Sequence, residues 1–162
     1  MIRLLLIYDY FYIEENNMCF MDEALKEAYV AFEEGEVPVG VVIVKDNKII
    51  ARAHNLKEKM MDVTKHAEII AIQKASKVLK NWRLNGCEMY VTLEPCIMCM
   101  GAIIQSRVSK LHIGTFNKDM GACGSVINLS NNRSLNSFVG IDWCYDERCS
   151  EVLNDFFNNK RK

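Results

Sequence analysis

Residues 89–106 read MYVTLEPCIMCMGAIIQS, and the fold class can be inferred from this segment. Its first five residues are rich in β-branched and aromatic side chains and predict a buried strand. Pro95 suits the first turn of a helix, and the apolar residues after it predict that this helix continues to about Ser106. A strand that leads directly into a helix is typical of an α/β layered protein.

A hairpin is expected before this unit. Residues 37–44 (VPVGVVIV) and 49–52 (IIAR) are strand-like runs joined by the polar turn 45–48. The first run is apolar at consecutive positions, so both faces of its strand should be buried, with helices on both sides of the sheet. Because the hairpin is antiparallel, the sheet is expected to be mixed.

The other elements alternate along the chain. Helices are expected at 22–35, 64–80 and 146–157, and strands at 108–113 and 138–143. Asp22 and Thr64 are interpreted as N-caps, and Gly35 as a C-terminal cap. The glycine-punctuated loop 114–124 is long enough to suggest a function. Residues 56–63 and 128–137 are expected to be surface connections.

Composition and charge limit the class of protein. The 162 residues, 50% hydrophobic and 25% charged, fit one globular domain that folds without disulfides and exclude a disordered, fibrous or coiled-coil chain. The net charge of −1 gives no global basic footprint for nucleic acid. Any nucleic-acid partner must therefore be indicated by local features.

The first residues resemble neither a signal peptide nor a membrane anchor. The apolar run 4–7 is interrupted by Asp9, has no cleavage site after it, and is far shorter than the roughly 18 residues that span a bilayer. We expect residues 1–20 to be an extension of a single domain at 21–160. The extension is a short strand, a loose segment, or coding sequence upstream of the true start.

The cysteines indicate both a compartment and a site. Seven cysteines, an odd number without a secretory signal, indicate reduced thiols and a cytoplasmic protein. Cys96 and Cys99 follow Pro95 at the strand-to-helix junction, where one helix face presents both thiols and the helix N-terminus favours thiolates. Four others are expected to be small buried hydrophobes: Cys87, Cys123, Cys144 and Cys149.

His66 with Cys96 and Cys99 gives three metal ligands. Singly, each motif has another interpretation: an ordinary hydrogen-bonded histidine, a redox pair, or half of a structural zinc site. No second pair completes a closed site, so the set predicts one catalytic Zn²⁺ per subunit with water as fourth ligand.

Glu68 is the candidate for moving protons. Residues i and i+2 diverge on a helix, so His66 and Glu68 can flank one water only in a first turn at a cavity edge.

His-x-Glu followed by Pro-Cys-x-x-Cys is the signature of zinc deaminases. Over roughly residues 21–160 the chain closely resembles the bacterial tRNA-specific adenosine deaminase family. The segments that carry the resemblance are 36–40 (EVPVG), 66–69 (HAEI), 92–102 (TLEPCIMCMGA), 106–107, 121–125 and 155–157.

The resemblance implies a three-layer α/β/α cytidine-deaminase-like fold, with a mixed five-stranded sheet between helices, usually as a homodimer. It implies hydrolytic deamination of adenosine to inosine at the wobble position of an arginine tRNA, with the anticodon stem-loop as partner. His66, Cys96 and Cys99 match the zinc ligands. Glu68 matches the residue that carries protons from the zinc-bound water to purine N1 and to the departing ammonia.

Three residues are expected to contact the substrate. Asn55 matches the residue that hydrogen-bonds the adenine edge, with a turn-capping asparagine as the alternative. Asn117 stands where the family commonly carries an aspartate that accepts from a ribose 2′-hydroxyl, so we expect a weaker preference for RNA over DNA. Phe157, near the basic residues 160–162, is expected at the anticodon loop or in a fraying helix, and Phe156 in the core.

Two other functions remain open. One is a free nucleobase or nucleoside deaminase acting on guanine, cytosine or cytidine with the same zinc chemistry. The other is a catalytically silent zinc module that binds RNA. Glu68 argues against the silent module, because a structural zinc needs no such carboxylate.

Overall fold

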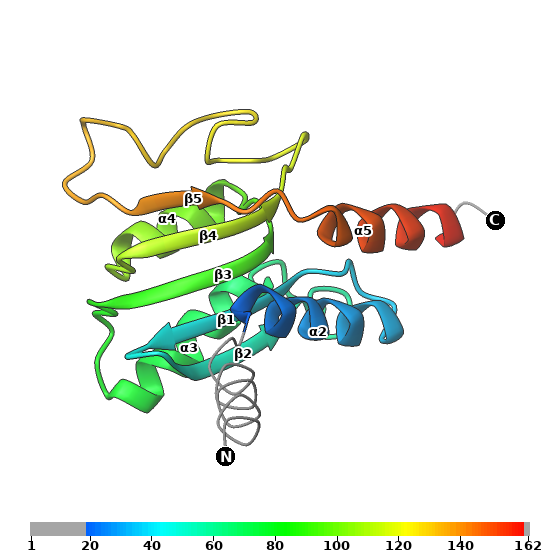
Figure 1. Cartoon of the computed structure of the whole chain (residues 1–162), viewed down its shortest axis with the longest axis horizontal. Coiled ribbons are helices and arrows are strands. Elements are labelled where there is room, and N and C mark those ends of the chain that lie inside the picture. The colour runs from blue at the N-terminus through cyan, green and yellow to red at the C-terminus, as the bar shows by residue number, and fades with distance from the viewer. Residues whose placement is uncertain (1–18, 161–162) are drawn as a thin grey trace, which may run out of the picture.

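Five strands form one mixed sheet in the order β2-β1-β3-β4-β5 in the computed structural model, which describes residues 19–160 (Figure 1). The strands are β1 Gly40–Lys45, β2 Lys48–His54, β3 Cys87–Leu93, β4 Lys110–Thr115 and β5 Gly140–Trp143. β1 pairs antiparallel with β2 and β3, whereas β3, β4 and β5 are parallel. The mixed five-stranded sheet expected from the sequence is confirmed.

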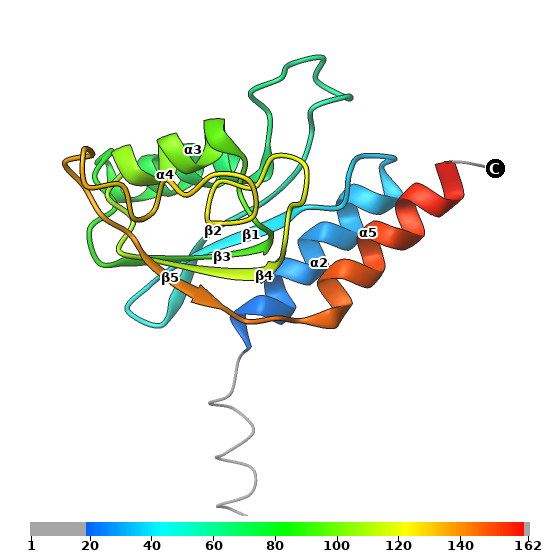
Figure 2. The same ribbon diagram turned by 90° about the horizontal axis from the view of Figure 1, so that it is seen from above.

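Helices cover both faces of this sheet. Figure 2 shows α3 (Ala67–Leu79) and α4 (Ile97–Gln105) on one side, and α2 (Phe20–Glu33) with α5 (Glu147–Lys160) on the other. The chain therefore has the expected three-layer α/β/α architecture.

The residues of β1 show why both faces need a cover. Val41 and Ile43 belong to the larger core beneath α3 and α4, whereas Val42 and Val44 belong to a second core beneath α2 and α5. All four side chains are buried. Period-two alternation of an entirely apolar strand places equal apolar surface on each side, as its sequence predicts.

Three expected helix starts are wrong by a few residues. α3 begins after its N-cap His66, because the Thr64 amide and hydroxyl instead bond to Asp62 Oδ1 in a turn. α4 begins after its N-cap Cys96, so Pro95 precedes the first turn instead of lying in it. α2 has Cys19 at its N-cap, and Asp22 lies in its first turn.

The prediction for Gly35 is confirmed, whereas one of the four cysteines expected to be buried is exposed. Gly35 does end α2: it has φ +78° and its amide donates to the Phe32 carbonyl. Cys87, Cys123 and Cys149 are buried as expected, but Cys144 is exposed, because it lies just beyond the end of the edge strand β5.

The extension expected at 1–20 falls almost wholly outside the described residues, as do two of the three basic residues at 160–162. Between residues 19 and 160, no helix is both long and apolar enough to cross a membrane.

Candidate active site

Two helix N-termini bring the three expected metal ligands together. His66 is the N-cap of α3, Cys96 is the N-cap of α4, and Cys99 lies in the first turn of α4. His66 Nδ1 lies 3.6 Å from Cys96 Sγ and 3.4 Å from Cys99 Sγ. All three donor atoms lie within 4.8 Å of one another, which suits a single ion.

The electrostatics of the cluster favour a thiolate. The Cys99 thiol and His66 both hydrogen-bond to Cys96 Sγ, which lowers the pKa of Cys96 to about 4. The same bond to Cys96, together with burial, raises the pKa of Cys99. One imidazole and two sulfur ligands at helix N-termini form a donor set that fits zinc.

Glu68 lies beside this cluster in the first turn of α3 and is only 4% exposed. Burial raises its pKa to about 7, so the carboxyl can both accept and return a proton near neutral pH. His66 has extended backbone angles, φ −71° and ψ 150°, so helical spacing does not separate it from Glu68. The later start of α3 thus removes the difficulty of the i, i+2 pair.

The cluster opens into a cavity of about 810 Å³. Its walls come from the ends of β2 and β3, the N-termini of α3 and α4, the loop after β4, and α5. Of the seven residues expected from the sequence to form the site, Cys99 is fully buried and is not among the lining residues. The other six line this cavity: Asn55, His66, Glu68, Cys96, Asn117 and Phe157.

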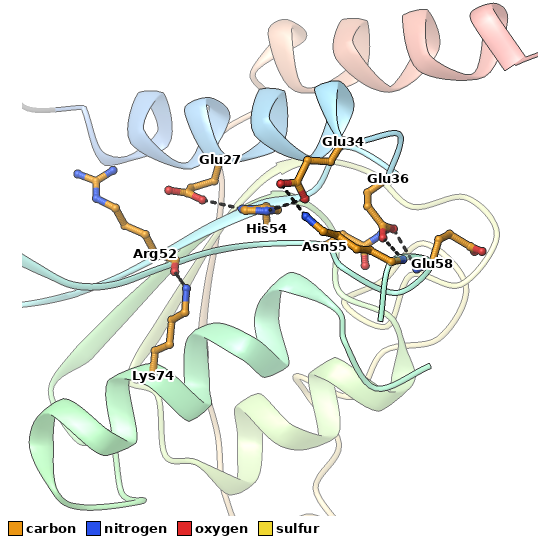
Figure 3. Close-up of polar contacts among 9 residues, drawn as sticks. Glu27, Glu34, Glu36, Arg52, His54, Asn55, Glu58 and Lys74 are labelled. Atoms are coloured by element: carbon orange, nitrogen blue, oxygen red, sulfur yellow. Dashed lines mark hydrogen bonds and ion pairs between the residues drawn. The ribbon is translucent and has the colours of Figure 1, made fainter. Parts of the chain in front are cut away.

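Asn55 presents a free acceptor in this cavity. The side chain is 6% exposed, and its Nδ2 donates to Glu36 Oε2 at 3.2 Å (Figure 3). Its Oδ1 has no hydrogen-bond partner, which is the single such case among buried side-chain atoms of residues 19–160. An unpaired buried carbonyl is costly, so this atom is suited to accept from a ligand N–H.

Asn117 and Phe157 occupy the rim of the cavity. The Asn117 carbonyl accepts from the backbone amides of Asp119 and Met120, and so shapes its own loop. Phe157 is 46% exposed at the cavity wall, whereas Phe156 is buried 5.7 Å from the ring of Phe32. The expected core position of Phe156 is confirmed.

A family model for MafB19-like deaminases matches residues 15–161. A tRNA-specific adenosine deaminase of Aquifex aeolicus is 46% identical over 142 residues, which cover 88% of this chain and 94% of that protein. The chain belongs to the tRNA-specific adenosine deaminase family.

Solved structures agree with this assignment to the tRNA-specific adenosine deaminases. A structure from work on A-to-I editing by tRNA:A34 deaminases at the wobble position aligns with TM-score 0.80 and 38% identity, over 83% of this chain and 98% of that one. A Bacillus subtilis guanine deaminase is 39% identical but aligns less well, with TM-score 0.60 over 64% of this chain and 67% of that one.

Two buried acids that the sequence analysis did not single out support the site of this family member. Glu36, 1% exposed, accepts from Asn55 and from the amides of Glu58 and Lys59, and so holds the loop after β2 (Figure 3). Glu94, also 1% exposed, lines the cavity. Glu94 is a lone charge at the end of an apolar strand, and that signal could have revealed it. Glu36 follows Glu33 and Glu34 in the sequence, so no such signal marks it.

Glu94 supports the opposite wall. Its carboxylate accepts from the backbone amides of Asn117, Cys123 and Ser125, at 3.0, 2.8 and 3.1 Å, and from the Ser125 hydroxyl. One side chain at the end of β3 therefore organises the loop after β4 beside the candidate metal ligands.

Proposed function

We propose that this chain is a zinc-dependent hydrolase that converts adenosine to inosine at the wobble position of an arginine tRNA anticodon. The observation that carries the proposal is one cavity that combines a His-Cys-Cys cluster, a buried carboxyl and a free amide acceptor. The proposal is also supported by the family to which the chain belongs and by its structural alignment with a tRNA:A34 deaminase.

His66, Cys96 and Cys99 would hold one zinc ion, with water as its fourth ligand. Bound there, zinc supplies an activated water near neutral pH. Glu68 is the catalytic acid and base. It takes a proton from the water and gives it to adenine N1 as the oxygen bonds to C6. It then moves the remaining hydroxyl proton to the amino group, so that the C6–N6 bond breaks and ammonia leaves.

Three residues would hold the target nucleotide. The free Oδ1 of Asn55 would accept from the adenine edge, because its own Nδ2 is held by Glu36. Phe157 would contact the anticodon loop through its exposed ring. Asn117 would lie near the ribose. Because its side chain is uncharged where the family commonly carries an aspartate, a weaker preference for RNA over DNA remains a prediction.

The assembly and location complete the proposal. The deaminase domain is residues 21–160, preceded by an extension at 1–20. The domain would work as a homodimer in the cytoplasm, where its thiols stay reduced.

An inosine assay tests the substrate. The purified protein, with bound zinc quantified, is given an arginine tRNA with adenosine at the first anticodon position, in parallel with free adenosine, guanine and cytidine. We expect inosine at that tRNA position and no reaction of the free compounds. Turnover of a free base, with the tRNA left unreacted, would still support zinc-dependent deamination but would refute tRNA as the substrate.

Glu68→Gln tests the mechanism in the same assay. The variant keeps the size of the side chain but cannot take up a proton, so we expect turnover to fall about 10²- to 10⁴-fold. Zinc content and unfolding midpoint should stay close to those of the parent. Unchanged turnover would refute the role of Glu68, and lost zinc would mean that Glu68 supports the metal site.

A further inference from the structure

A second group of metal-binding side chains lies on β4 and β5. His112 and Asp142 are direct partners in the parallel pairing of the two strands. Cys144 follows Asp142 by two residues, and its amide still bonds to the Ile113 carbonyl, so it lies on the same face of the sheet. His112 Nδ1 or Nε2, an Asp142 oxygen and Cys144 Sγ all lie within 4.8 Å of one another.

The ring of His112 is held in place from two sides. Its Nε2 lies 2.7 Å from Glu88 Oε2, and its face stacks on Tyr90 with ring centroids 4.0 Å apart and planes 3° apart. If the neutral ring donates its Nε2–H to Glu88, the lone pair lies on Nδ1, the atom 2.7 Å from Asp142 Oδ2. A carboxylate behind a histidine is how many metal sites orient that ligand.

This group is separate from the catalytic cluster. Tyr90, against which His112 stacks, packs in the core beneath α2 and α5, near Phe20. The candidate catalytic ligands lie at the N-termini of α3 and α4, on the other face of the sheet (Figure 2). One ion cannot serve both groups.

We propose that His112, Asp142 and Cys144 form a second metal site, which takes a divalent ion that accepts nitrogen, oxygen and thiolate ligands, with Zn²⁺ as the best fit. A thiolate ligand disfavours Mg²⁺ and Ca²⁺. The ion would replace the proton between His112 Nδ1 and Asp142, and the thiol proton of Cys144 would leave to solvent. Three ligands with one open position would attach the edge strand β5 to β4.

The alternative for this group is a purely electrostatic one. The His112 ring lies between the carboxylates of Asp142 and Glu88, and Lys110 Nζ lies 3.9 Å from Asp142 Oδ2. A protonated imidazole between two carboxylates would join β3, β4 and β5 without any metal. Cys144 would then have no part, and this difference is what an experiment can measure.

Metal content separates the two cases. The reduced full chain is incubated with excess Zn²⁺, freed of unbound metal by gel filtration, and analysed for zinc per chain. We expect two zinc ions in the parent, one in Cys144→Ser, and two in the control Cys87→Ala, whose thiol is buried in the core on the other face. One zinc in the parent, or equal zinc in the parent and Cys144→Ser, would overturn the proposal.

A Co²⁺ titration gives a second readout that is independent of deaminase activity. Glu88→Ala leaves all three ligands in place but removes the carboxylate that orients His112, so we expect affinity at the second site to fall about 10- to 100-fold. The Co²⁺ absorption of the catalytic site should be unchanged. Identical affinities for two Co²⁺ ions in parent and variant would refute the role of Glu88 and the ligand set built on it.

Discussion

At the scale of single residues, buried acids hold the candidate site in shape. Glu94 accepts four hydrogen bonds from the loop after β4, and three of its donors are backbone amides. A carboxylate has only acceptor oxygens, so it can satisfy a group of N–H donors that no amide side chain could satisfy in full. The cavity wall therefore depends on the charge of Glu94 and on its shape.

Replacing this acid should cost both stability and activity. In Glu94→Gln one acceptor oxygen becomes an NH₂ that faces N–H donors, so we expect the free energy of unfolding to fall by roughly 1–3 kcal/mol. Turnover on the anticodon hairpin should fall as well, because Asn117 and Phe116 belong to the same wall. Urea unfolding and single-turnover rates measure the two effects.

The matched control is Glu147→Gln in α5, where the side chain is exposed. It should stay within about 0.5 kcal/mol of the parent, as surface substitutions usually do. If Glu94→Gln behaved like this control, Glu94 would not be what orders the loop.

The roles of single residues differ in how far sequence predicts them. The grouping of His66, Cys96 and Cys99 was predictable, because few chemistries need those residues in that pattern. The role of Glu94 was not, since three of its four donors are backbone amides, up to 31 residues away, and almost any residue type supplies an amide. The same holds for Glu36, which binds amides 22 and 23 residues ahead.

At the scale of elements, the position of α2 depends on the absence of a side chain in β1. A Cβ on Gly40 would overlap the Ala24 carbonyl oxygen and the Ala28 amide nitrogen, both in the backbone of α2. Main-chain atoms cannot swing aside as a flexible side chain can. The helix therefore packs directly on Gly40, the first residue of the strand, which follows the cavity-lining residue Val39.

Gly40→Ala and Gly101→Ala should consequently have opposite effects. In Gly40→Ala, α2 must move, so we expect a loss of about 1–3 kcal/mol or more in the free energy of unfolding. Gly101 lies within α4 with nothing within 4 Å of an added Cβ. There alanine should stabilise by about 0.5–1 kcal/mol. Thermal unfolding compares the pair, and a Gly40→Ala as stable as the parent would contradict this packing.

Element type was predictable here, whereas element starts were not. The hairpin and the strand before Pro95 follow from local pattern, and both are confirmed. The start of α3 depends on whether Thr64 caps the helix or bonds to Asp62, and both choices are local and similar in energy. The difference matters, because the N-cap is His66 and not Thr64.

At the scale of the whole molecule, a net charge of −1 must be reconciled with a polyanionic substrate. Binding of RNA depends on local neutralisation of phosphates and not on the sum of charges. Among the described residues that line the cavity, the lysines are Lys57 and Lys118, which lie on loops at its two walls, after β2 and after β4. Both side chains are exposed, and they flank the site where the target base would enter.

If these two lysines contact phosphates beside the target adenosine, the salt dependence of binding should report them. Each contact to single-stranded RNA contributes about 0.7 to the slope of log affinity against log salt, so Lys57→Gln with Lys118→Gln should reduce the slope by about 1.4. Fluorescence anisotropy of an anticodon hairpin across a salt series measures it. The control pair is Lys48→Gln with Lys77→Gln, at the far ends of the hairpin and of α3. Both double variants remove the same charge, so an equal loss of slope would mean that total charge, and not this rim, attracts the RNA.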